Sequence, residues 1–309
     1  MSDSQSVDVG VVIVTFNSSD HLDGLLRTLE TSLQSVSHRV VAVDNLSTDA
    51  SVARLRAAGI EVIEMGCNAG YAAGINVGLR RMSDARAVLV LNPDIEMAPN
   101  CVETMLGVLQ DERVGIVIPQ TRDLEGNLSS SQRRDPSFWR ALGAAVFGGS
   151  HVSRWPRLSE FVADENAYLH PVDVDWGVGA VMLISRACLD QVGEWDESFF
   201  LYSEETDYCQ RARRAGFRVR YEPSAIVRHE GGGGVSQPTL RSMMVVNKVR
   251  LYRRQHGVVP SVGFWLAEIL NESTRALAGN KAARAAVTAL LLPSRRPPEI
   301  KCSASLLPR

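Results

Sequence analysis

Residues 9–16 read VGVVIVTF, an almost unbroken apolar run. A run of this length without polar alternation is typical of a strand that is buried on both faces of a parallel sheet. Leucines recur at helical spacing from Leu22 to Leu33, and the polar residues 18–20 (SSD) stand before them as candidate helix caps. A buried strand followed by an amphipathic helix predicts the first part of a βαβ unit.

The same alternation of strand and helix patterns continues to residue 119. Strands are predicted at 39–43, 60–64, 87–91 and 114–119, and helices at 70–82 and 99–109. This order implies right-handed crossovers and therefore an α/β fold, with a mainly parallel, Rossmann-like central sheet flanked by helices. In such a sheet the ligand site lies at the carboxyl ends of the strands.

The rest of the chain is predicted to extend this sheet and then to become helical. Residues 135–170 show no sharp periodicity, whereas strands are predicted within 172–185 and 217–227, and helices at 203–215, 239–255 and 261–292. We therefore expect one domain over residues 1–238, with halves at about 8–120 and 121–238, and a helical C-terminal extension over residues 239–309.

Composition indicates a globular protein whose charge is unevenly distributed. The chain has 309 residues, 45% of them hydrophobic and 22% charged, which excludes a disordered or collagen-like chain. Residues 1–239 carry a net charge of −11, whereas residues 240–309 carry 12 basic and 3 acidic side chains. The weakly acidic body argues against a nucleic-acid partner, and the basic tail leaves room for contact with an anionic membrane surface.

No part of the sequence predicts a leader or a membrane span. The polar start MSDSQSVDVG does not resemble a signal peptide, and no stretch of about 18 uncharged apolar residues occurs. The five cysteines lack metal or redox spacing, as expected for idle thiols in a reducing compartment. We therefore expect a cytoplasmic protein.

Polar side chains follow four of the predicted strands. They are Thr15-Phe16-Asn17, Asp44-Asn45 with residues 47–49 (STD), Asn68-Ala69-Gly70-Tyr71, and Asn92-Pro93-Asp94. Each cluster alone could be a turn or a helix cap. Four clusters at one edge of a parallel sheet predict a ligand site, because the carboxyl ends of the strands meet there.

Two groups of acids stand where they could do chemistry. Asp94 directly follows a buried strand, where a carboxylate can hold Mg²⁺ or Mn²⁺ beside phosphate oxygens; a turn aspartate is the alternative. Glu204 and Glu205 begin a predicted helix after the aromatic run at 199–202 (FFLY). The helix dipole alone accounts for acids there. A carboxylate beside apolar rings can also have a raised pKa and act as a general base.

The phosphate-binding motifs of several other α/β enzymes are absent. Neither a G-x-G-x-x-G fingerprint after the first strand, nor a Walker A loop, nor a G-x-S-x-G elbow occurs. Instead, residues 68–76 (NAGYAAGIN) place small side chains at the start of a predicted helix, where the backbone can approach an anion closely. Asp44 could accept a hydrogen bond from a base N–H or a ribose hydroxyl.

Six segments together resemble family 2 inverting glycosyltransferases of the GT-A fold. They are TFN (15–17), VDNLSTD (43–49), NAGYAAGIN (68–76), LNPD (91–94), WGVGA (176–180) and YSEETDYCQR (202–211), and the resemblance covers about residues 8–235. Within this family the sequence is most similar to bacterial rhamnosyltransferases, which transfer L-rhamnose from dTDP-rhamnose to a GlcNAc-diphospho-polyprenol. The resemblance implies a nucleotide-sugar half over 8–120, an acceptor half over 121–238, and Mg²⁺ or Mn²⁺ as the cofactor.

The resemblance also implies roles for individual residues. Glu205 falls where most family members carry the catalytic aspartate, and Asn92-Pro93-Asp94 replaces the usual D-x-D, with Asp94 in the metal-binding position and His229 as a second metal contact. The nucleotide-sugar site then consists of Thr15, Phe16, Asn17, Asp44, Asn68, Gly70, Tyr71, Asn76, Asn92 and Asp94. The acceptor site consists of Trp176, Gly179, Ala180 and Glu204.

These roles imply a single displacement with inversion. Glu205 would deprotonate the acceptor hydroxyl, and Asp94 would hold the metal at the diphosphate. Each of two basic residues has two alternative interpretations. His229 could instead be a polar loop histidine, and Arg133 could pair with the diphosphate or be a solvated loop arginine.

The basic C-terminal extension also has more than one interpretation. Residues 261–292 carry apolar side chains at helical spacing, with Arg275, Lys281 and Arg284 among them. They could lie on the inner membrane leaflet near a lipid-linked acceptor. They could equally cap the catalytic domain, or form the contact of a homodimer.

Two rival functions remain open from the sequence. A nucleotidyltransferase-like enzyme could use a similar sheet, although no Gly-rich basic loop follows the first strand. A catalytically inactive nucleotide-binding scaffold is supported only by the departures at Glu205 and Asn92. Whether donor hydrolysis depends on Asp94 and Glu205 separates these alternatives from a glycosyltransferase.

Overall fold

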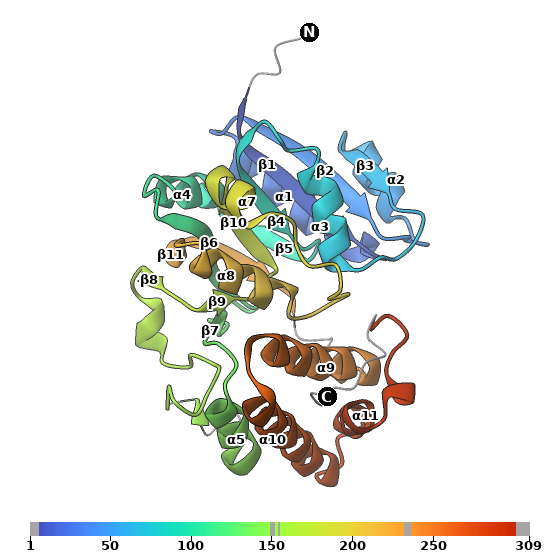
Figure 1. The fold of residues 1–309 in the computed structure, drawn as a ribbon. Coiled ribbons are helices and arrows are strands. Elements are labelled where there is room, and N and C mark those ends of the chain that lie inside the picture. The colour runs from blue at the N-terminus through green and yellow to red at the C-terminus, as the bar shows by residue number, and fades with distance from the viewer. Residues whose placement is uncertain (1–5, 149–151, 154, 232–235, 301–309) are drawn as a thin grey trace.

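The computed structural model describes residues 6–148, 152–153, 155–231 and 236–300, and Figure 1 shows their arrangement. A central sheet flanked by helices occupies the upper part of the view, and a group of helices lies below it. Among the described residues, no helix is both long and apolar enough to cross a membrane.

The central sheet has the strand order β3-β2-β1-β4-β10-β6-β11-β5. Its parallel members are β1 (Val7–Thr15), β2 (His38–Asp44), β3 (Glu61–Glu64), β4 (Ala85–Leu91), β6 (Val114–Arg122) and β11 (Arg218–His229). Three strands run against them: β10 (Val181–Ser185) between β4 and β6, and β5 (Ile95–Met97) and β8 (Val172–Asp173) beside β11. The predicted α/β fold with a mainly parallel sheet is confirmed.

Strand β1 explains why the sheet is buried on both faces. Val9, Val11 and Ile13 belong to one hydrophobic core, and Val12 and Val14 belong to another, because successive side chains of a strand point to opposite faces. The first core is covered by α1 (Leu22–Leu33), α2 (Ser51–Ala57) and α4 (Cys101–Val108). The second is covered by α3 (Tyr71–Leu79), α7 (Arg186–Val192) and α8 (Glu204–Arg214).

The sequence pattern does not predict three of the described α-helices, namely α2, α5 (Phe138–Phe147) and the seven-residue α7. Helix α2 has only seven residues, of which Ser51 and Leu55 are buried, so no helical period can show. Helix α5 lies in the segment without sharp periodicity, because its exposed side chains are as apolar as its buried ones. The structure also contains short 3-10 helices and two-residue strands: η1 (Ser19–His21), β7 (Gln132–Arg133), η2 (Glu165–Tyr168), β9 (Trp176–Gly177) and η4 (Pro293–Arg295).

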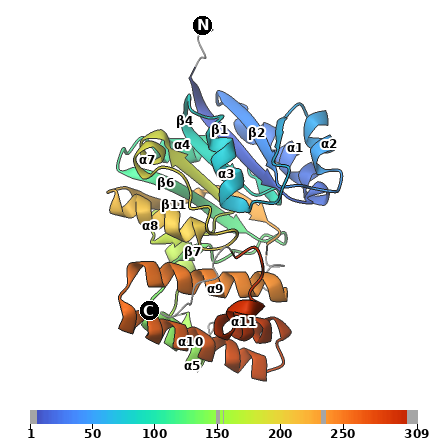
Figure 2. The same cartoon turned by 45° about the vertical axis from the view of Figure 1, so that its right-hand side comes forward.

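The C-terminal extension consists of α9 (Pro238–Gln255), α10 (Val258–Leu277) and α11 (Lys281–Leu291). Together with α5, these helices enclose a third hydrophobic core that includes Val246, Phe264 and Leu290. Figure 1 and Figure 2 both place α9 next to the sheet domain and α10 beyond α9, with α5 beside α10. The helical pattern predicted over 261–292 is therefore divided into two helices, and the domain boundary at residue 238 stays a prediction.

Candidate active site

The ends of β1 and β2 are joined through their side chains. Thr15 Oγ1 donates to Asp44 Oδ1 (2.9 Å), and the Ser47 hydroxyl and N–H donate to the same carboxylate at 2.5 and 2.8 Å. Asp44 is only 2% exposed. Since a carboxylate offers about four acceptor positions, these bonds leave room for one more. Asp44 therefore fixes the loop after β2 and can still accept one hydrogen bond from a ligand.

The loop after β1 is held against the loop after β2. Asn17 lies in the left-handed region with a φ of 50°, and its Oδ1 accepts from the N–H of Thr48 (2.8 Å). The N–H of Asn17 donates to Ser47 Oγ (2.8 Å). Phe16 stays 50% exposed beside these loops, so the ring can stack on a planar ligand.

Gly70 is required by both its conformation and its surroundings. Its φ is 96°, and an added Cβ would collide with the carbonyl oxygen of Phe200. The N–H of Tyr71 donates to that same carbonyl (2.8 Å), and Asn68 Oδ1 accepts from the N–H of Gly70 (3.2 Å). The segment 68–71 is thereby joined to the loop that precedes α8.

Asn76, which is predicted to bind the nucleotide sugar, uses its side-chain amide for contacts within the protein. Its side chain is fully buried, and its Oδ1 accepts from the N–H of Trp195 (2.8 Å). Its Nδ2 donates to the carbonyl of Trp195 and to Glu197 Oε1, both at 3.0 Å. Because both donor hydrogens have partners, Asn76 secures the loop after α7 and has no free N–H for a ligand.

Asp94 and His229 meet beside β5, which pairs with the end of β11. Asp94 Oδ2 lies 3.1 Å from His229 Nε2, and Asp94 Oδ1 is buried without a hydrogen-bond partner in the described part of the chain. Burial acts to raise the pKa of Asp94, but the hydrogen bond and charge of His229 outweigh it, so the pKa lies below its usual value. The imidazole of His229 thus faces the carboxylate that is predicted to bind the metal.

The donor set at Asp94 fits a hard divalent cation. An unpartnered carboxylate oxygen lies beside an imidazole, and Mg²⁺ or Mn²⁺ commonly completes such a set with phosphate and water oxygens. Within the described ranges, no group of three or more His, Cys, Asp or Glu side chains is suited to hold a metal ion. Asp94 and His229 would therefore hold a cation only together with oxygens of a bound ligand.

Helix α8 begins with two carboxylates held away from water. Tyr202 and Ser203 precede it in the left-handed region, with φ of 67° and 75°, so the chain turns sharply into the helix. Glu204 is 3% exposed, and the Oε2 atoms of Glu204 and Glu205 are buried without a hydrogen-bond partner among the described residues. These atoms have lost water without gaining a protein donor, which is the condition for a strong base.

Burial raises the pKa of both glutamates. The charge of Glu205 raises the pKa of Glu204 further, to well above its usual value. At Glu205, backbone hydrogen bonds and the charge of Arg133 oppose the effect of burial but do not cancel it. Glu205 is therefore a stronger base than an exposed glutamate.

Tyr71 lies near both groups of acids. Its pKa is raised well above the usual value by burial and then by the charges of Glu204, Glu205 and Asp94, so all three carboxylates lie near one phenol. The Tyr71 hydroxyl donates to the carbonyl of Gly179 (3.2 Å). The structure thus brings the predicted base, the predicted metal-binding residue and the predicted acceptor segment to one site.

The acceptor segment 176–180 is placed by β9 and β10. Trp176 Nε1 donates to the carbonyl of Arg134 (3.0 Å), and the carbonyl of Ala180 accepts from the N–H of Asn92 (2.8 Å). Gly179 lies so close to α8 that an added Cβ would be 2.9 Å from Glu205 Cβ. The contact between Gly179 and Glu205 therefore sets the position of the predicted base.

This contact predicts the effect of Gly179→Ala. The added methyl group must displace Glu205 or its helix, and a displacement of about 1 Å lowers kcat by about 10–100-fold. Gly107→Ala is the matched control, because an added Cβ at Gly107 meets nothing within 4 Å. The measurement is kcat together with the thermal unfolding midpoint of each variant. Equal kcat values for the two folded variants would contradict the prediction.

The structure contradicts the interpretation of Arg133 as a solvated loop arginine. Its guanidinium donates to the carbonyls of Ser130 and Gln132 and lies 4.4 Å from the centre of the Phe161 ring. Burial lowers its pKa, and its charge acts on Glu205. Arg133 therefore supplies positive charge to the base from inside the protein.

The sequence gives no sign that the C-terminal extension supports the site. In α9, Asn247 Nδ2 donates to the carbonyl of Leu201 (2.9 Å), and Arg250 donates to the carbonyl of Ser198 (3.1 Å) and to Asn247 Oδ1 (2.7 Å). These bonds hold the loop that leads into Glu204 and Glu205. The burial of Asn247, which marks it for this role, shows only in the structure.

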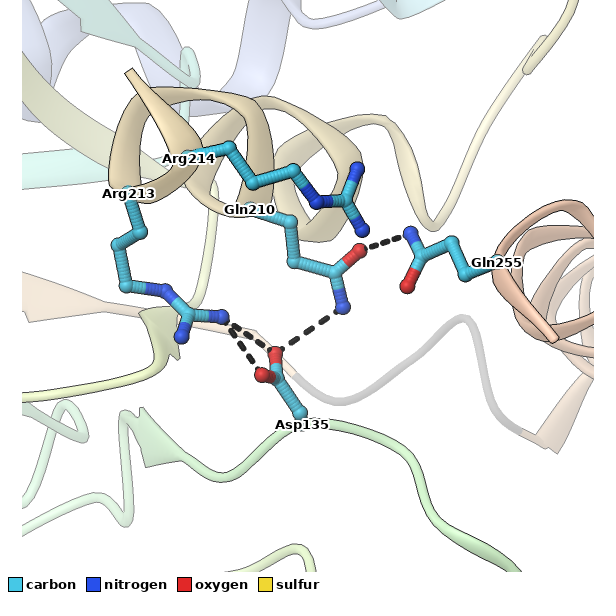
Figure 3. A pocket seen from close by; sticks show the side chains of 5 residues that line it. All are labelled: Asp135, Gln210, Arg213, Arg214 and Gln255. Carbon is cyan, nitrogen blue, oxygen red and sulfur yellow. Dashed lines mark hydrogen bonds and ion pairs between the residues drawn. The ribbon is translucent and has the colours of Figure 1, made fainter. Parts of the chain in front are cut away.

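Helix α8 is held at its other end as well. Asp135, Gln210, Arg213, Arg214 and Gln255 line a hollow of about 240 Å³. Figure 3 shows Arg213 and Gln210 both directed at the carboxylate of Asp135, while Gln255 of α9 meets Gln210. The hollow contains none of the predicted site residues. Its hydrogen bonds join α8 to α9 and to the segment after β7.

The comparisons with known proteins agree on one family. Residues 10–169 match the family described as Glycosyl transferase family 2. The chain is 30% identical over 234 residues to the N-acetylglucosaminyl-diphospho-decaprenol L-rhamnosyltransferase of Mycobacterium tuberculosis, an alignment that covers 71% of this chain and 75% of the relative. It is 25% identical to the rhamnosyltransferase WbbL of Escherichia coli, with 70% of this chain and 81% of the relative covered.

Solved structures agree on the fold. A mannosyltransferase from Pyrobaculum calidifontis, solved in complex with GDP-Man and Mn²⁺, superposes with a TM-score of 0.53 at 16% identity. The superposition covers 98% of this chain and 86% of that structure. At this identity the likeness concerns the fold, which is the GT-A fold that the sequence resemblance predicts.

Proposed function

Because the chain belongs to glycosyltransferase family 2, we propose that it is a metal-dependent inverting rhamnosyltransferase that moves L-rhamnose from dTDP-rhamnose to a glycan or lipid-linked hydroxyl. One observation carries the proposal: Glu205 and Asp94 lie around Tyr71, and each has a buried carboxylate oxygen without a partner in the described residues. The two relatives named as rhamnosyltransferases support the choice of sugar.

Glu205 is the general base of the proposed reaction. It takes the proton from the acceptor hydroxyl while that oxygen forms the new bond to the anomeric carbon. The bond from this carbon to the phosphate oxygen breaks, and its electron pair leaves with dTDP. Since no protein nucleophile takes part, the configuration of the sugar inverts. Tyr71 and Gly179 keep Glu205 in place for this transfer.

The nucleotide diphosphate lies on the other side of the site in this proposal. Phe16 stacks on the base, and the remaining acceptor position of Asp44 takes a base or ribose donor. Asp94 and His229 hold the cation, which when bound neutralises charge on the leaving diphosphate. The Mn²⁺ in the Pyrobaculum calidifontis structure supports a divalent metal.

The other proposed contacts follow from the same placement. Trp176, Gly179, Ala180 and Glu204 face the acceptor, and the enzyme works at the cytoplasmic face of the plasma membrane, where a nucleotide sugar can meet a polyprenol-linked glycan. An inactive scaffold is the weaker alternative, because it would not need a base whose pKa is raised by burial. Membership of the family removes the support for a nucleotidyltransferase.

A donor panel tests the proposal. The purified chain is given dTDP-rhamnose, UDP-sugars or GDP-sugars together with a GlcNAc-diphospho-lipid, in Mn²⁺, in Mg²⁺ or in chelator, and the products are read by mass spectrometry. We expect rhamnose transfer from dTDP-rhamnose that chelator abolishes. Transfer from a UDP- or GDP-sugar alone would show that the donor is that nucleotide sugar and not dTDP-rhamnose. No transfer from any donor by a folded chain would favour the scaffold.

A further inference from the structure

Helix α10 buries polar side chains beside Phe264 and leaves several of its large apolar side chains exposed. The side turned into the protein carries Glu268, Asn271 and Glu272, which are at most 8% exposed. The opposite side carries Val259, Leu266, Leu270 and Leu277 at spacings of seven, four and seven residues, and all of them are exposed. A helix that only capped a domain would place its apolar stripe inward.

The inward acids of α10 form ion pairs with basic side chains of α9. Lys248 Nζ lies 2.7 Å from both Glu160 Oε1 and Glu268 Oε1, and Arg241 donates to both oxygens of Glu272 at 2.6 and 2.8 Å. Burying an ion is costly unless it is paired in this way. The orientation of α10 is therefore fixed by these pairs, and its leucines are left on the outside.

Helix α5 adds to the exposed apolar surface. It lies beside α10, where Phe138 of α5 is 3.2 Å from the position that a Cβ on Gly263 would take. Trp139 is 63% exposed, and Val146, Phe147 and Trp155 are all more than half exposed. We call the exposed large apolar side chains of α10 and α5 the outer face; it comprises Trp139, Val146, Phe147, Val258, Val259, Leu266, Leu270 and Leu277.

The exposed charges on α11 and η4 are all positive. Glu268 and Glu272 are the only acids in α10 and α11, and both are buried. The exposed charges on α11 and η4 are Lys281, Arg284 and Arg295. An apolar helix face flanked by basic exposed side chains, here those of α11 and η4, is the combination that binds an anionic bilayer surface. A second copy of the chain would bring like charges together instead.

We propose that the outer face docks on the surface of an anionic lipid bilayer. Figure 1 and Figure 2 place α10 on the side of α9 away from the central sheet, so the outer face is turned away from the sheet domain. Helix α9, which holds the loop before Glu204, lies between them. The docking rests on this surface alone and does not depend on the proposed donor sugar.

Co-sedimentation with vesicles tests the docking. The whole chain is mixed with vesicles of phosphatidylcholine, or of phosphatidylcholine with phosphatidylglycerol, at low and high salt. We expect binding to the anionic vesicles that Leu266→Glu with Leu270→Glu weakens by at least about tenfold and that high salt weakens too. Leu124→Glu is the matched control, because Leu124 is also 50% exposed but lies on the turn after β6.

Three results would overturn the proposal. They are no binding of the wild-type chain to anionic vesicles, equal binding to neutral ones at every salt concentration, or unchanged binding by the doubly substituted chain. Sedimentation velocity in the absence of lipid is measured in parallel. If the wild-type chain forms a dimer that the double substitution dissociates, and if it binds no vesicles, then the outer face is the contact between two copies of the chain. Thermal midpoints confirm folding, and transfer to a water-soluble acceptor reports the proposed function separately.

Discussion

Replacing Glu205 by glutamine is expected to lower kcat by about 10²–10⁴-fold. Glutamine has nearly the same shape, so α8 and its contact with Gly179 are retained, but the side chain can no longer take a proton. Donor binding should stay close to that of the wild type, since Glu205 is not placed at the diphosphate. The kcat and the donor Kd of the two proteins measure both parts of this expectation.

The pH dependence of the same reaction gives a second sign of the base. Only the ionised carboxylate can accept a proton, and burial raises the pKa of Glu205 above its usual value of 4.5. The rate should therefore fall as the pH is lowered through that raised pKa, at a pH above the one at which an exposed glutamate would titrate.

Glu205→Asp is the conservative comparison, because it keeps a carboxylate at the start of α8. It retains a base that is one methylene shorter, so part of the activity should return. If Glu205→Gln keeps wild-type kcat while its unfolding midpoint is unchanged, another group is the base.

Asp94→Asn is expected to abolish the metal response of the protein and to lower kcat by at least about 100-fold. The amide can still accept the hydrogen bond from His229, so the local fold should survive. It removes the charge that would hold a divalent cation beside the diphosphate. The direct readout is the rise of the thermal midpoint with dTDP-rhamnose and Mn²⁺, because a ligand of the folded state stabilises it.

Asp84→Asn is the matched control for Asp94. Asp84 immediately precedes β4, whereas Asp94 follows its end, and Asp84 pairs with Arg39 at 2.8 Å. The substitution weakens a partly buried, bidentate pair with Arg39 and so lowers the midpoint of the unliganded chain. The rise of the midpoint with metal should be kept in full. A metal-dependent midpoint rise that persists in Asp94→Asn would move the cation site elsewhere.

The edge of the sheet was predictable because its signals are local. Buried parallel strands can be recognised from unbroken apolar runs such as residues 9–16, and their carboxyl ends follow directly. Thr15, Asp44, Asp94 and Glu205 were found in this way or through the resemblance. The chemistry of each side chain then indicates what it can bind.

What the sequence did not reveal depends on contacts between distant segments. Asn76 shares a motif with Gly70, yet its amide is occupied by the loop at Trp195. Asn247 supports the loop before α8 from a helix that carries no glycosyltransferase motif. The exposure of the leucines of α10 follows from the ion pairs of Lys248 and Arg241, which hold the acids of this helix inward. No local period records such pairings.

One titration tests the base and the metal site together by comparing three proteins. Thermal midpoints of the wild type, Asp94→Asn and Glu205→Gln are measured with dTDP-rhamnose, with and without Mn²⁺, and rhamnose transfer is measured in the same samples. We expect Glu205→Gln to keep the metal-dependent rise but to transfer rhamnose at least about 100-fold more slowly than the wild type. We expect Asp94→Asn to lose the rise and to be slowed to a similar extent. A chain in which Glu205→Gln loses the rise and Asp94→Asn keeps it would contradict the assignment of base and metal site.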